Sequence, residues 1–390
     1  MAIISMNQRI GTYITQKIAG ESYKAYVPPK LPPKPPIDLA RLYPYLEKAT
    51  IALAELNSVH KSIPNTALFV YMYVRKEALL SSQIEGTQSS FSDLMLFEHH
   101  QKPKVSLDDV EEVSNYVKAI TYGLKSLKEG FPLSLRLLRD IHGVLLSGEH
   151  GAVKLPGEFR RSQNWIGGTR PGTALFVPPP VDQLNQCLSD FENFLHDNTL
   201  PVLIKAGLAH VQFETIHPFL DGNGRLGRLL ITLLLCNSGM LDEPILYLSL
   251  YLKQNRHVYY DLLQEVRLHG TWETWLEFFL EGIFNSSKQA MQTALLINNL
   301  FEQDIKKISS LGRARFSCEQ TLEYLKKLPQ VTTTLLVSEL GMTAPTARSS
   351  LNNMVSLGIL EEMSGKKRDK IYVYRNYLNI LEDGAQPFKQ

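Results

Sequence analysis

One stretch near the middle of the chain decides both its fold and its chemistry: His217-Pro218-Phe219-Leu220-Asp221-Gly222-Asn223-Gly224-Arg225-Leu226-Gly227-Arg228. It joins the end of one apolar helix to the start of another. Gly222 and Gly224 free the backbone for a tight concave turn, and the helix that starts near Arg225 leaves its first amide groups unpaired. Helix starts of this kind bind anions. The stretch therefore predicts a phosphate-binding turn between two helices.

The charged residues of the same stretch have the types that phosphate chemistry needs. Arg225 and Arg228 stand three apart on one helix face, where both guanidinium groups can hold phosphate oxygens. Asp221 is a hard oxygen ligand for a divalent ion such as Mg²⁺. His217, with its near-neutral pKa, can take a proton from an attacking hydroxyl. No Gly-Lys-Ser/Thr follows the glycines, so the turn is not a P-loop.

The stretch resembles the HPFxDGNGRxxR signature of the Fic family at every specified position. That family transfers a nucleotidyl group, usually AMP from ATP, to a hydroxyl side chain of a protein. The resemblance implies that His217 is the base and that Asp221 holds Mg²⁺. It implies that Asn223, Gly224 and Arg225 seat the α- and β-phosphates and that Arg228 holds the γ-phosphate. The implied ATP-binding set in the stretch is Gly222, Asn223, Gly224, Arg225, Leu226, Gly227 and Arg228.

A second motif, Ser81-Ser82-Gln83-Ile84-Glu85-Gly86, ends a predicted helix. By itself it is a helix terminus with a C-cap glycine and one more solvated carboxylate. It also resembles the inhibitory (S/T)xxxE(G/N) motif of Fic proteins. The resemblance implies that Glu85 pairs with Arg228 and that Ser81 helps to orient it. A Glu85 carboxylate paired with Arg228 would occupy the arginine that the γ-phosphate needs and would repel the triphosphate. A local ion pair would thus act as a switch.

Two other segments resemble parts of the family less sharply. Residues 158–180 resemble the flap that pairs with a target peptide as an added β-strand, so we expect the protein substrate to dock there. Tyr259 and Tyr260 occupy the place where the family packs aromatic residues against the adenine. A tyrosine in an apolar helix is as often a core residue, and both interpretations stay open at this point.

Periodicity predicts a mainly α-helical chain: a Fic-type helical bundle with a short β-hairpin flap, followed by a winged helix. Alternation over residues 12–27 predicts a hairpin, and the six prolines of residues 28–36 predict a stiff connector. Ser106 with Asp109 resembles a capping box at the start of a helix. Helices are predicted at residues 39–56, 68–86, 110–120, 133–146, 181–195, 202–213, 225–237, 246–268 and 272–300.

The C-terminal part has a different texture. Residues 318–328, 333–340 and 345–357 read as three helices, the last two as helix-turn-helix, and residues 360–362 and 371–374 read as strands around a basic turn. This order is typical of a winged helix, whose second helix commonly enters the DNA major groove. Residues 345–357 hold no distinct run of base-reading side chains. Fic proteins also use such domains for protein contacts, so DNA binding by residues 313–381 remains one alternative.

Composition bounds the remaining classes. The 390 residues favour two or three domains, which we place at 1–105, 106–300 and 313–381. The three cysteines are odd in number and far apart, which argues against a disulfide framework and a zinc site and favours a cytoplasmic protein. The N-terminus lacks the pattern of a signal peptide, and no apolar run approaches the ~18 residues of a membrane span. The net charge of +2 conceals a basic C-terminal part, where residues 313–375 carry ten Lys or Arg against six Asp or Glu.

These inferences predict Mg²⁺-dependent transfer of AMP from ATP to a Ser, Thr or Tyr hydroxyl of a protein, including self-modification, held in check by Glu85. Two alternatives accompany this hypothesis. The same site could remove AMP by hydrolysis, or the chain could be a DNA-binding transcriptional regulator that uses its winged helix. ATP and a protein substrate are the expected partners, a homodimer is left open, and no membrane partner is expected.

Overall fold

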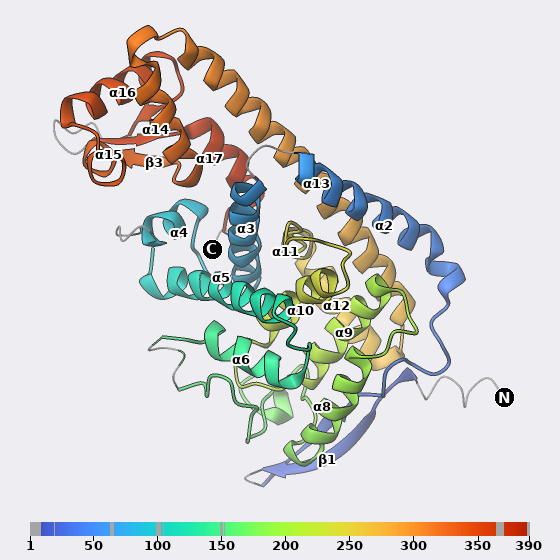
Figure 1. The fold of residues 1–390 in the computed structure, drawn as a ribbon. Helices are drawn as coiled ribbons and strands as arrows, with labels where there is room; N and C mark the ends of the chain where they lie inside the picture. Colours follow the sequence, from blue (N-terminus) through green and yellow to red (C-terminus); the bar gives the residue numbers. More distant parts are fainter. Residues whose placement is uncertain are drawn as a thin grey trace.

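The computed structural model describes residues 9–387 except 19, 63–65, 99–102, 104, 149–150, 152 and 364–369. The mainly helical fold is confirmed (Figure 1). Its helices before the C-terminal part are α2 Leu39–Ser62, α3 Thr66–Glu85, α4 Phe91–Glu98, α5 Leu107–Lys128, α6 Leu135–Leu145, α8 Val181–Leu195, α9 Val202–Ile216, α10 Asn223–Asn237, α11 Ser249–Gln254, α12 Arg256–His269 and α13 Trp272–Ser309.

Helices α9 and α10 form the centre of the molecule, and the twelve-residue motif joins them. Almost every side chain of α9 is buried, from Leu203 to Ile216, because α8, α10 and α13 pack around it. A helix that is apolar on all sides is stable only in such a position. The motif is therefore anchored at both ends by core helices.

The predicted hairpin is present as β1 Thr12–Ile18 and β2 Glu21–Val27, paired in antiparallel register with Thr12 opposite Val27. It packs on the Gly- and Pro-rich segment before the motif: the Tyr26 amide donates to the Val177 carbonyl over 2.9 Å, and the Tyr26 ring contacts Phe176. Residues 158–180 carry only one β-bridge, Ile166 to Phe176, and a short 3₁₀ turn, η2 Pro171–Thr173.

Two local predictions were wrong. The helix expected over residues 246–268 is interrupted: α11 ends and α12 begins around Asn255, whose side-chain amide donates to the Tyr251 carbonyl over 2.9 Å and competes with regular helix geometry. The capping box at Ser106 does not form, because the Ser106 side chain makes no cap hydrogen bond and Asp109 accepts from the Gln88 amide over 2.7 Å instead.

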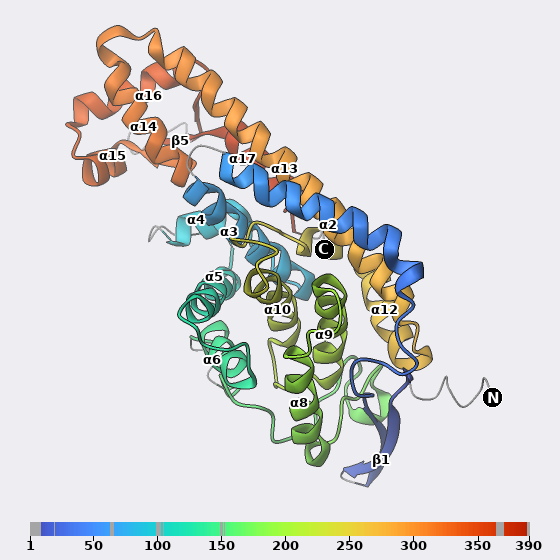
Figure 2. The same cartoon turned by 45° about the vertical axis from the view of Figure 1, so that its right-hand side comes forward.

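Helix α13 is 38 residues long and continues past residue 300, where the prediction ended it. It runs alongside α2 over much of its length and carries the C-terminal part at its far end (Figure 2). The proposed domain boundaries stay a prediction. Helix α13 continues without a break past residue 300, where we placed the end of the second domain.

The C-terminal part contains η3 Gly312–Ala314, α14 Arg315–Lys327, β3 Gln330–Thr332, α15 Thr333–Leu340, α16 Ala344–Ser356, β4 Glu361–Glu362, β5 Ile371–Val373 and α17 Arg375–Glu382. Its three strands pair antiparallel in the order β3-β5-β4. The predicted helices and two strands are present, whereas β3 and α17 were not predicted. The predicted basic turn falls mostly on residues 364–369, outside the described residues. No described helix has the length and apolarity to cross a membrane.

Candidate functional site

The motif begins with a backbone conformation that is unusual for a residue with a side chain. Helix α9 ends at Ile216, and His217 follows it in the left-handed region, with φ of 48°. A non-glycine residue adopts this conformation only where its surroundings hold it there. The His217 carbonyl accepts two hydrogen bonds from the flap, from Arg160 Nε at 3.0 Å and from Asn164 Nδ2 at 3.1 Å. The flap therefore fixes the direction of the His217 side chain.

The His217 imidazole is arranged to act as a base. Its Nδ1 lies 3.3 Å from the Glu214 carbonyl oxygen, which can only accept, so Nδ1 carries the proton and Nε2 keeps a free electron pair. Burial lowers the pKa of His217 to about 4, and the nearby Arg267 acts in the same direction. The ring is therefore neutral at physiological pH and can take a proton through Nε2.

The Asn223 side chain has a structural role in the turn, and its part in seating phosphates stays a prediction. The buried side chain closes the turn: Oδ1 accepts from the Phe219 amide and Nδ2 donates to the Phe219 carbonyl, both over 2.9 Å. The Asn223 side chain is thus committed to the loop. What this turn offers a phosphate is backbone, since the amides of residues 223–225 precede the first hydrogen bond of α10, from the Leu226 amide to the Gly222 carbonyl.

Asp221 lies on the open side of the turn. Its side chain is 43% exposed, accepts from the Gly222 amide over 2.6 Å and lies 3.5 Å from Arg225 Nη2. No group of three His, Cys, Asp or Glu side chains in the described parts of the chain could hold a metal ion. A Mg²⁺ ion here would have Asp221 as its protein ligand and would take its other ligands from nucleotide phosphates and water, which is how Mg²⁺ is commonly bound beside phosphates.

Buried His142 supports Asp221 from behind. Its Nδ1 accepts from the Gly157 amide over 2.9 Å, so Nε2 carries the proton and donates to the Asp221 carbonyl over 3.0 Å. The ring stacks on Phe219 with centroids 3.7 Å apart. His142 therefore links the start of the flap segment to the Asp221 end of the motif.

Both arginines of the motif face Glu85, which the end of α3 brings in from far away in the sequence. Arg228 Nη2 lies 2.6 Å from Glu85 Oε1, and Arg225 Nε lies 3.1 Å from Glu85 Oε2. Ser81 does not orient Glu85 directly: it accepts from Arg228, through Oγ at 2.8 Å and through its carbonyl at 2.9 Å. Ser81 thus positions the arginine, and Glu85 reaches an arginine that is already held.

The electrostatics of this pair favour the charged forms. Burial alone would raise the pKa of Glu85, but Arg228 and Arg225 together hold it below its ordinary value. Glu85 lowers the energy of the charged guanidinium in turn and raises the pKa of Arg228 in spite of burial. Gly224 makes the approach feasible, because a Cβ at that position would lie 2.3 Å from Glu85 Oε1.

Two carboxyl groups at the site had no sequence signal. Glu112 of α5 lies 3.1 Å from Arg225 Nη1, and burial raises its pKa to about 7. Glu214 is buried one turn before His217, with Oε2 at 4.0 Å from the His217 Nδ1, and burial raises its pKa to about 7 as well. Both stand on helices whose pattern predicts only their apolar faces.

The motif, Glu85 and the flap enclose a cavity of about 340 Å³, lined by Glu85, Trp165, Ile166, Gly167, Glu214, His217, Leu220, Asp221, Gly222, Asn223, Gly224, Arg228, Tyr259 and Tyr260. Tyr259 is 1% exposed and its hydroxyl lies 2.8 Å from His210 Nε2, so it is a core residue at the cavity wall. Tyr260 is 41% exposed and is the more accessible ring. Leu226 is fully buried, and Gly227 faces His210 through its carbonyl and Glu214 through its Cα.

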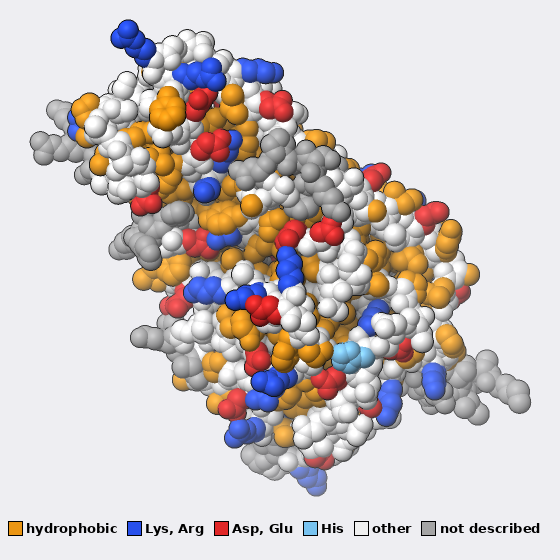
Figure 3. Space-filling model, viewed as in Figure 1, with side chains coloured by type: hydrophobic (Ala, Val, Ile, Leu, Met, Phe, Trp, Pro, Cys, Tyr) orange, Lys and Arg blue, Asp and Glu red, His pale blue; other side chains and the backbone are white. Residues whose placement is uncertain are grey.

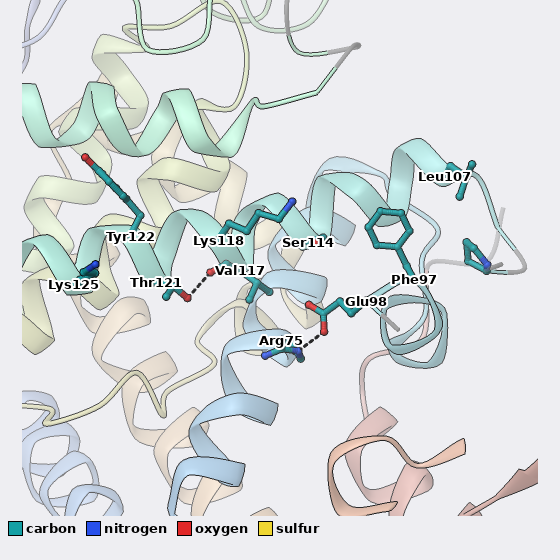
Figure 4. A pocket seen from close by; sticks show the side chains of 11 residues that line it. Arg75, Phe97, Glu98, Leu107, Ser114, Val117, Lys118, Thr121, Tyr122 and Lys125 are labelled. Carbon is teal, nitrogen blue, oxygen red and sulfur yellow. Dashed lines mark hydrogen bonds and ion pairs between the residues drawn. The ribbon is translucent and has the colours of Figure 1, made fainter. Parts of the chain in front are cut away.

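A larger cavity lies elsewhere, between α3, α4 and α5 (Figure 4). Its volume is about 990 Å³ and its walls are mostly apolar, with the Arg75–Glu98 ion pair (2.7 Å) and Lys118 on its rim. None of the predicted site residues lines it. The size of a cavity therefore does not locate the chemistry of this protein.

Comparisons with known proteins agree with the geometry of the site. Residues 132–235 match the model of the Fic/DOC family, and residues 43–125 match that of the Fic/DOC family N-terminal region. The curated relatives include a protein adenylyltransferase Fic of Drosophila virilis, which is 31% identical over 235 residues (58% of this chain and 44% of the relative). The protein adenylyltransferase Fic of Aedes aegypti is 36% identical over 165 residues (41% of this chain and 30% of the relative). The chain thus spans less than half the length of these relatives.

A solved structure, of a Fic family protein from Desulfovibrio desulfuricans G20, shares the fold. It superposes with a TM-score of 0.54 at 19% identity and covers 85% of this chain and 96% of its own. The complete motif between α9 and α10, the flap that holds it and both family matches lead to one assignment: residues 43–125 and 132–235 of this chain are the N-terminal and Fic regions of the Fic/DOC family.

Proposed function

We propose that the protein transfers AMP from ATP to a Ser, Thr or Tyr hydroxyl of a protein. One observation carries the proposal: a neutral His217, with Nε2 free, lies in the same cavity as Asp221, the N-terminus of α10 and Arg228. These are a base, a metal ligand and an anion site within one turn and one helix.

In the proposed reaction, these groups act as follows. The substrate hydroxyl oxygen attacks the α-phosphorus while His217 Nε2 takes the hydroxyl proton. The bond from the α-phosphorus to the oxygen that bridges to the β-phosphate breaks, and pyrophosphate leaves. The amides at the start of α10 and the guanidinium groups of Arg225 and Arg228 stabilise the charge on the phosphates. Mg²⁺, when held by Asp221, would neutralise part of that charge.

We further propose that Glu85 inhibits the reaction. Its carboxylate occupies both arginines, at 2.6 and 3.1 Å, so a triphosphate meets a negative charge where it needs a positive one. The protein substrate would lie along the flap and would add main-chain hydrogen bonds beside the Ile166–Phe176 bridge. Self-modification and a cytoplasmic location belong to the same proposal.

Intact mass spectrometry tests the proposal. The wild type, Glu85→Gly and His217→Ala are incubated with ATP and Mg²⁺. We expect the mass of one or more AMP groups on Glu85→Gly, much less on the wild type and none on His217→Ala. An added phosphate in place of AMP would overturn the proposed reaction, and equal labelling of wild type and Glu85→Gly would overturn the inhibition. Loss of AMP from a labelled sample after ATP is removed would favour the hydrolytic alternative.

DNA binding by the C-terminal part is a second candidate, favoured by one surface. Helix α16 exposes a polar face that includes Thr346, Arg348, Ser349 and Asn352. Against it, acidic and basic side chains are interspersed over the molecular face seen in Figure 3. A titration with duplex DNA at several salt concentrations distinguishes DNA binding from protein docking. Phosphate contacts would make the affinity for DNA fall steeply as the salt concentration rises, and no binding at low salt would favour a protein-docking role.

A further inference from the structure

The chain after α17 turns back into the catalytic part and lies against α3, the helix that ends at Glu85. Helix α17 packs on α13 and α4, with Tyr377 and Leu378 buried between them, and the tail that follows buries Ala385 to 2% exposure. The last described residues are therefore part of the packed structure around α3.

Hydrogen bonds attach this tail to α3 two residues before Glu85. Gln83 Nε2 donates to the Ala385 carbonyl over 2.9 Å and to the Ser89 carbonyl over 2.8 Å. Gln83 Oε1 accepts from Lys253 Nζ over 2.7 Å, and the same ammonium donates to the carbonyls of Gly384 and Gln386. We call the set of Gln83, Lys253 and the carbonyls of residues 384–386 the tail lock.

The two side chains of the tail lock are buried, so water does not replace the hydrogen bond between them while the tail stays in place. Gln83 is completely buried and Lys253 is 6% exposed. A buried amide or ammonium that loses its acceptor carries a large desolvation cost, which is relieved only if the surrounding segment moves. The segment next to Gln83 is the last turn of α3, where the Arg256 side chain also donates to the Ile84 carbonyl over 3.0 Å.

A second attachment lies further up α3. Lys76 is 1% exposed, and its Nζ has no hydrogen-bond partner among the described residues. Burial lowers the pKa of Lys76 to about 8, and the charge that opposes this effect is Asp383, the first residue after α17. The tail therefore supplies α3 with a hydrogen-bond acceptor at Gln83, and the charge of Asp383 favours the protonated form of Lys76. The start of α4 joins the same region, since the Ser92 amide donates to Glu382 over 3.3 Å.

We propose that residues 383–387 are a lock on the inhibitory helix: they hold the last turn of α3, and with it Glu85, in the nucleotide site. Displacement of the tail, as by a partner that binds the C-terminal part, frees that turn and raises AMP transfer. The inference rests on the proposed inhibition by Glu85 and adds what controls it. It connects the C-terminal part, through α17 and the residues after it, to the arginines of the motif.

The test compares the rate of AMP transfer of Δ384–390 with that of the wild type, measured by intact mass spectrometry after incubation with ATP and Mg²⁺. We expect a roughly tenfold faster AMP transfer for the deletion, since its loss of buried hydrogen bonds shifts the balance between held and released Glu85. Lys253→Met, which removes the ammonium at the centre of the tail lock, is expected to act in the same direction. Gln386→Ala is the matched control: it changes a tail side chain but keeps the carbonyl that Lys253 contacts, and we expect its rate within twofold of the wild type.

Further readouts keep the lock separate from the proposed function. Amide hydrogen exchange of residues 82–85 is expected to be faster in Δ384–390 than in the wild type, whatever the activity, and unchanged exchange would overturn the lock. If Glu85→Gly shows no raised transfer, the proposed inhibition fails while the exchange result still judges the lock. If Glu85→Gly is active, adding the deletion to it should give no further rise. A further rise in AMP transfer in that double variant would overturn the proposal. An active Glu85→Gly together with no rise in transfer for Δ384–390 or Lys253→Met alone would overturn it as well. If Δ384–390 does not fold, the result for Lys253→Met decides.

Discussion

At the scale of single residues, the site depends on a histidine whose proton is held on the far side of the ring. The Glu214 carbonyl accepts from Nδ1, and the flap holds the His217 carbonyl, so both the tautomer and the direction of the ring are set by hydrogen bonds to backbone atoms. The adjacent Glu214 carboxyl group lies close enough to influence the ring electrostatically.

The pH dependence of AMP transfer tests this arrangement. Because the pKa of His217 is lowered to about 4, the base form persists as the pH falls, and transfer by Glu85→Gly should hold between pH 8 and about 5 and decline as the pH approaches 4. Initial rates across this range measure it. A half-loss near the ordinary histidine value of 6.5 would contradict the buried, neutral imidazole. Glu214→Gln serves as a control, since burial raises the pKa of Glu214 to about 7.

Asn164 of the flap offers a second test at this scale. Its amide donates to the carbonyls of His217 and Phe219 over 3.1 and 2.9 Å. Asn164→Ala should lower the transfer rate roughly tenfold and the free energy of unfolding by about 1–2 kcal/mol, because the left-handed His217 loses one of its supports. Gln163→Ala should affect the rate much less, because the Gln163 amide donates to the Asn164 and Pro178 carbonyls within the flap. Equal losses in both variants would show that general flap stability, not the support of His217, sets the rate.

At the scale of secondary-structure elements, the helices of the C-terminal part begin at residues that local capping rules identify. Thr332 and Thr343 cap α15 and α16 through their hydroxyl groups, which accept from the Leu335 and Thr346 amides. Pro345 stands in the first turn of α16, where its missing amide costs nothing. These local rules explain why the boundaries of α15 and α16 were predicted to within one residue.

Removal of the cap of α16 should destabilise that helix. For Thr343→Ala we expect a loss of about 1 kcal/mol in the stability of α16, measured by amide hydrogen exchange across residues 344–356. Ser349→Ala, in the exposed middle of the same helix, should leave protection equal or slightly higher because alanine favours helix. Reduced protection in both variants would contradict a specific effect of the cap.

At the scale of the whole molecule, the core contains carboxyl groups that stay protonated at pH values well above their ordinary pKa. Glu77 of α3 is an example: it accepts from the Ser249 amide over 3.0 Å, and burial raises its pKa from 4.5 to about 7. The buried imidazoles of His142, His210 and His217 act in the opposite sense, since burial lowers the pKa of each to about 4.

A comparison of the wild type with Glu77→Gln isolates one of these contributions. The folded state keeps a proton on Glu77 that the unfolded chain loses above pH 4.5. The contribution of Glu77 to the free energy of unfolding is therefore complete below about pH 4.5 and is lost as the pH rises through about 7. The wild type should therefore lose stability relative to Glu77→Gln between pH 5 and 7.5, as measured by chemical denaturation. Glu302→Gln, on an exposed part of α13, controls for the removal of one negative charge. A difference between wild type and Glu77→Gln that is constant with pH would contradict the raised pKa.

The sequence by itself determined the helical fold, the twelve-residue motif and the candidate residues, because these depend on local chemistry. Helical period, caps, glycines and the order of charged residues act over a few positions and can be read directly. The same limits explain the errors: α11 and α12 separate at an asparagine whose side chain competes with the backbone, and Asp109 leaves Ser106 for the Gln88 amide.

Only the tertiary structure decided which groups meet. The family resemblance implied the pairing of Glu85 with Arg228, 143 residues away, but the contact of Gln83 with Ala385, 302 residues away, had no sequence signal. The support of His217 by Arg160 and Asn164, the pairing of Arg225 with Glu112 and the return of the C-terminal tail to α3 likewise depend on how helices pack. No local pattern records such contacts, because each is made by a side chain whose partner is brought to it by the burial of other residues. Burial also decided the pKa values, since the cost of a charge depends on what surrounds it in the folded chain.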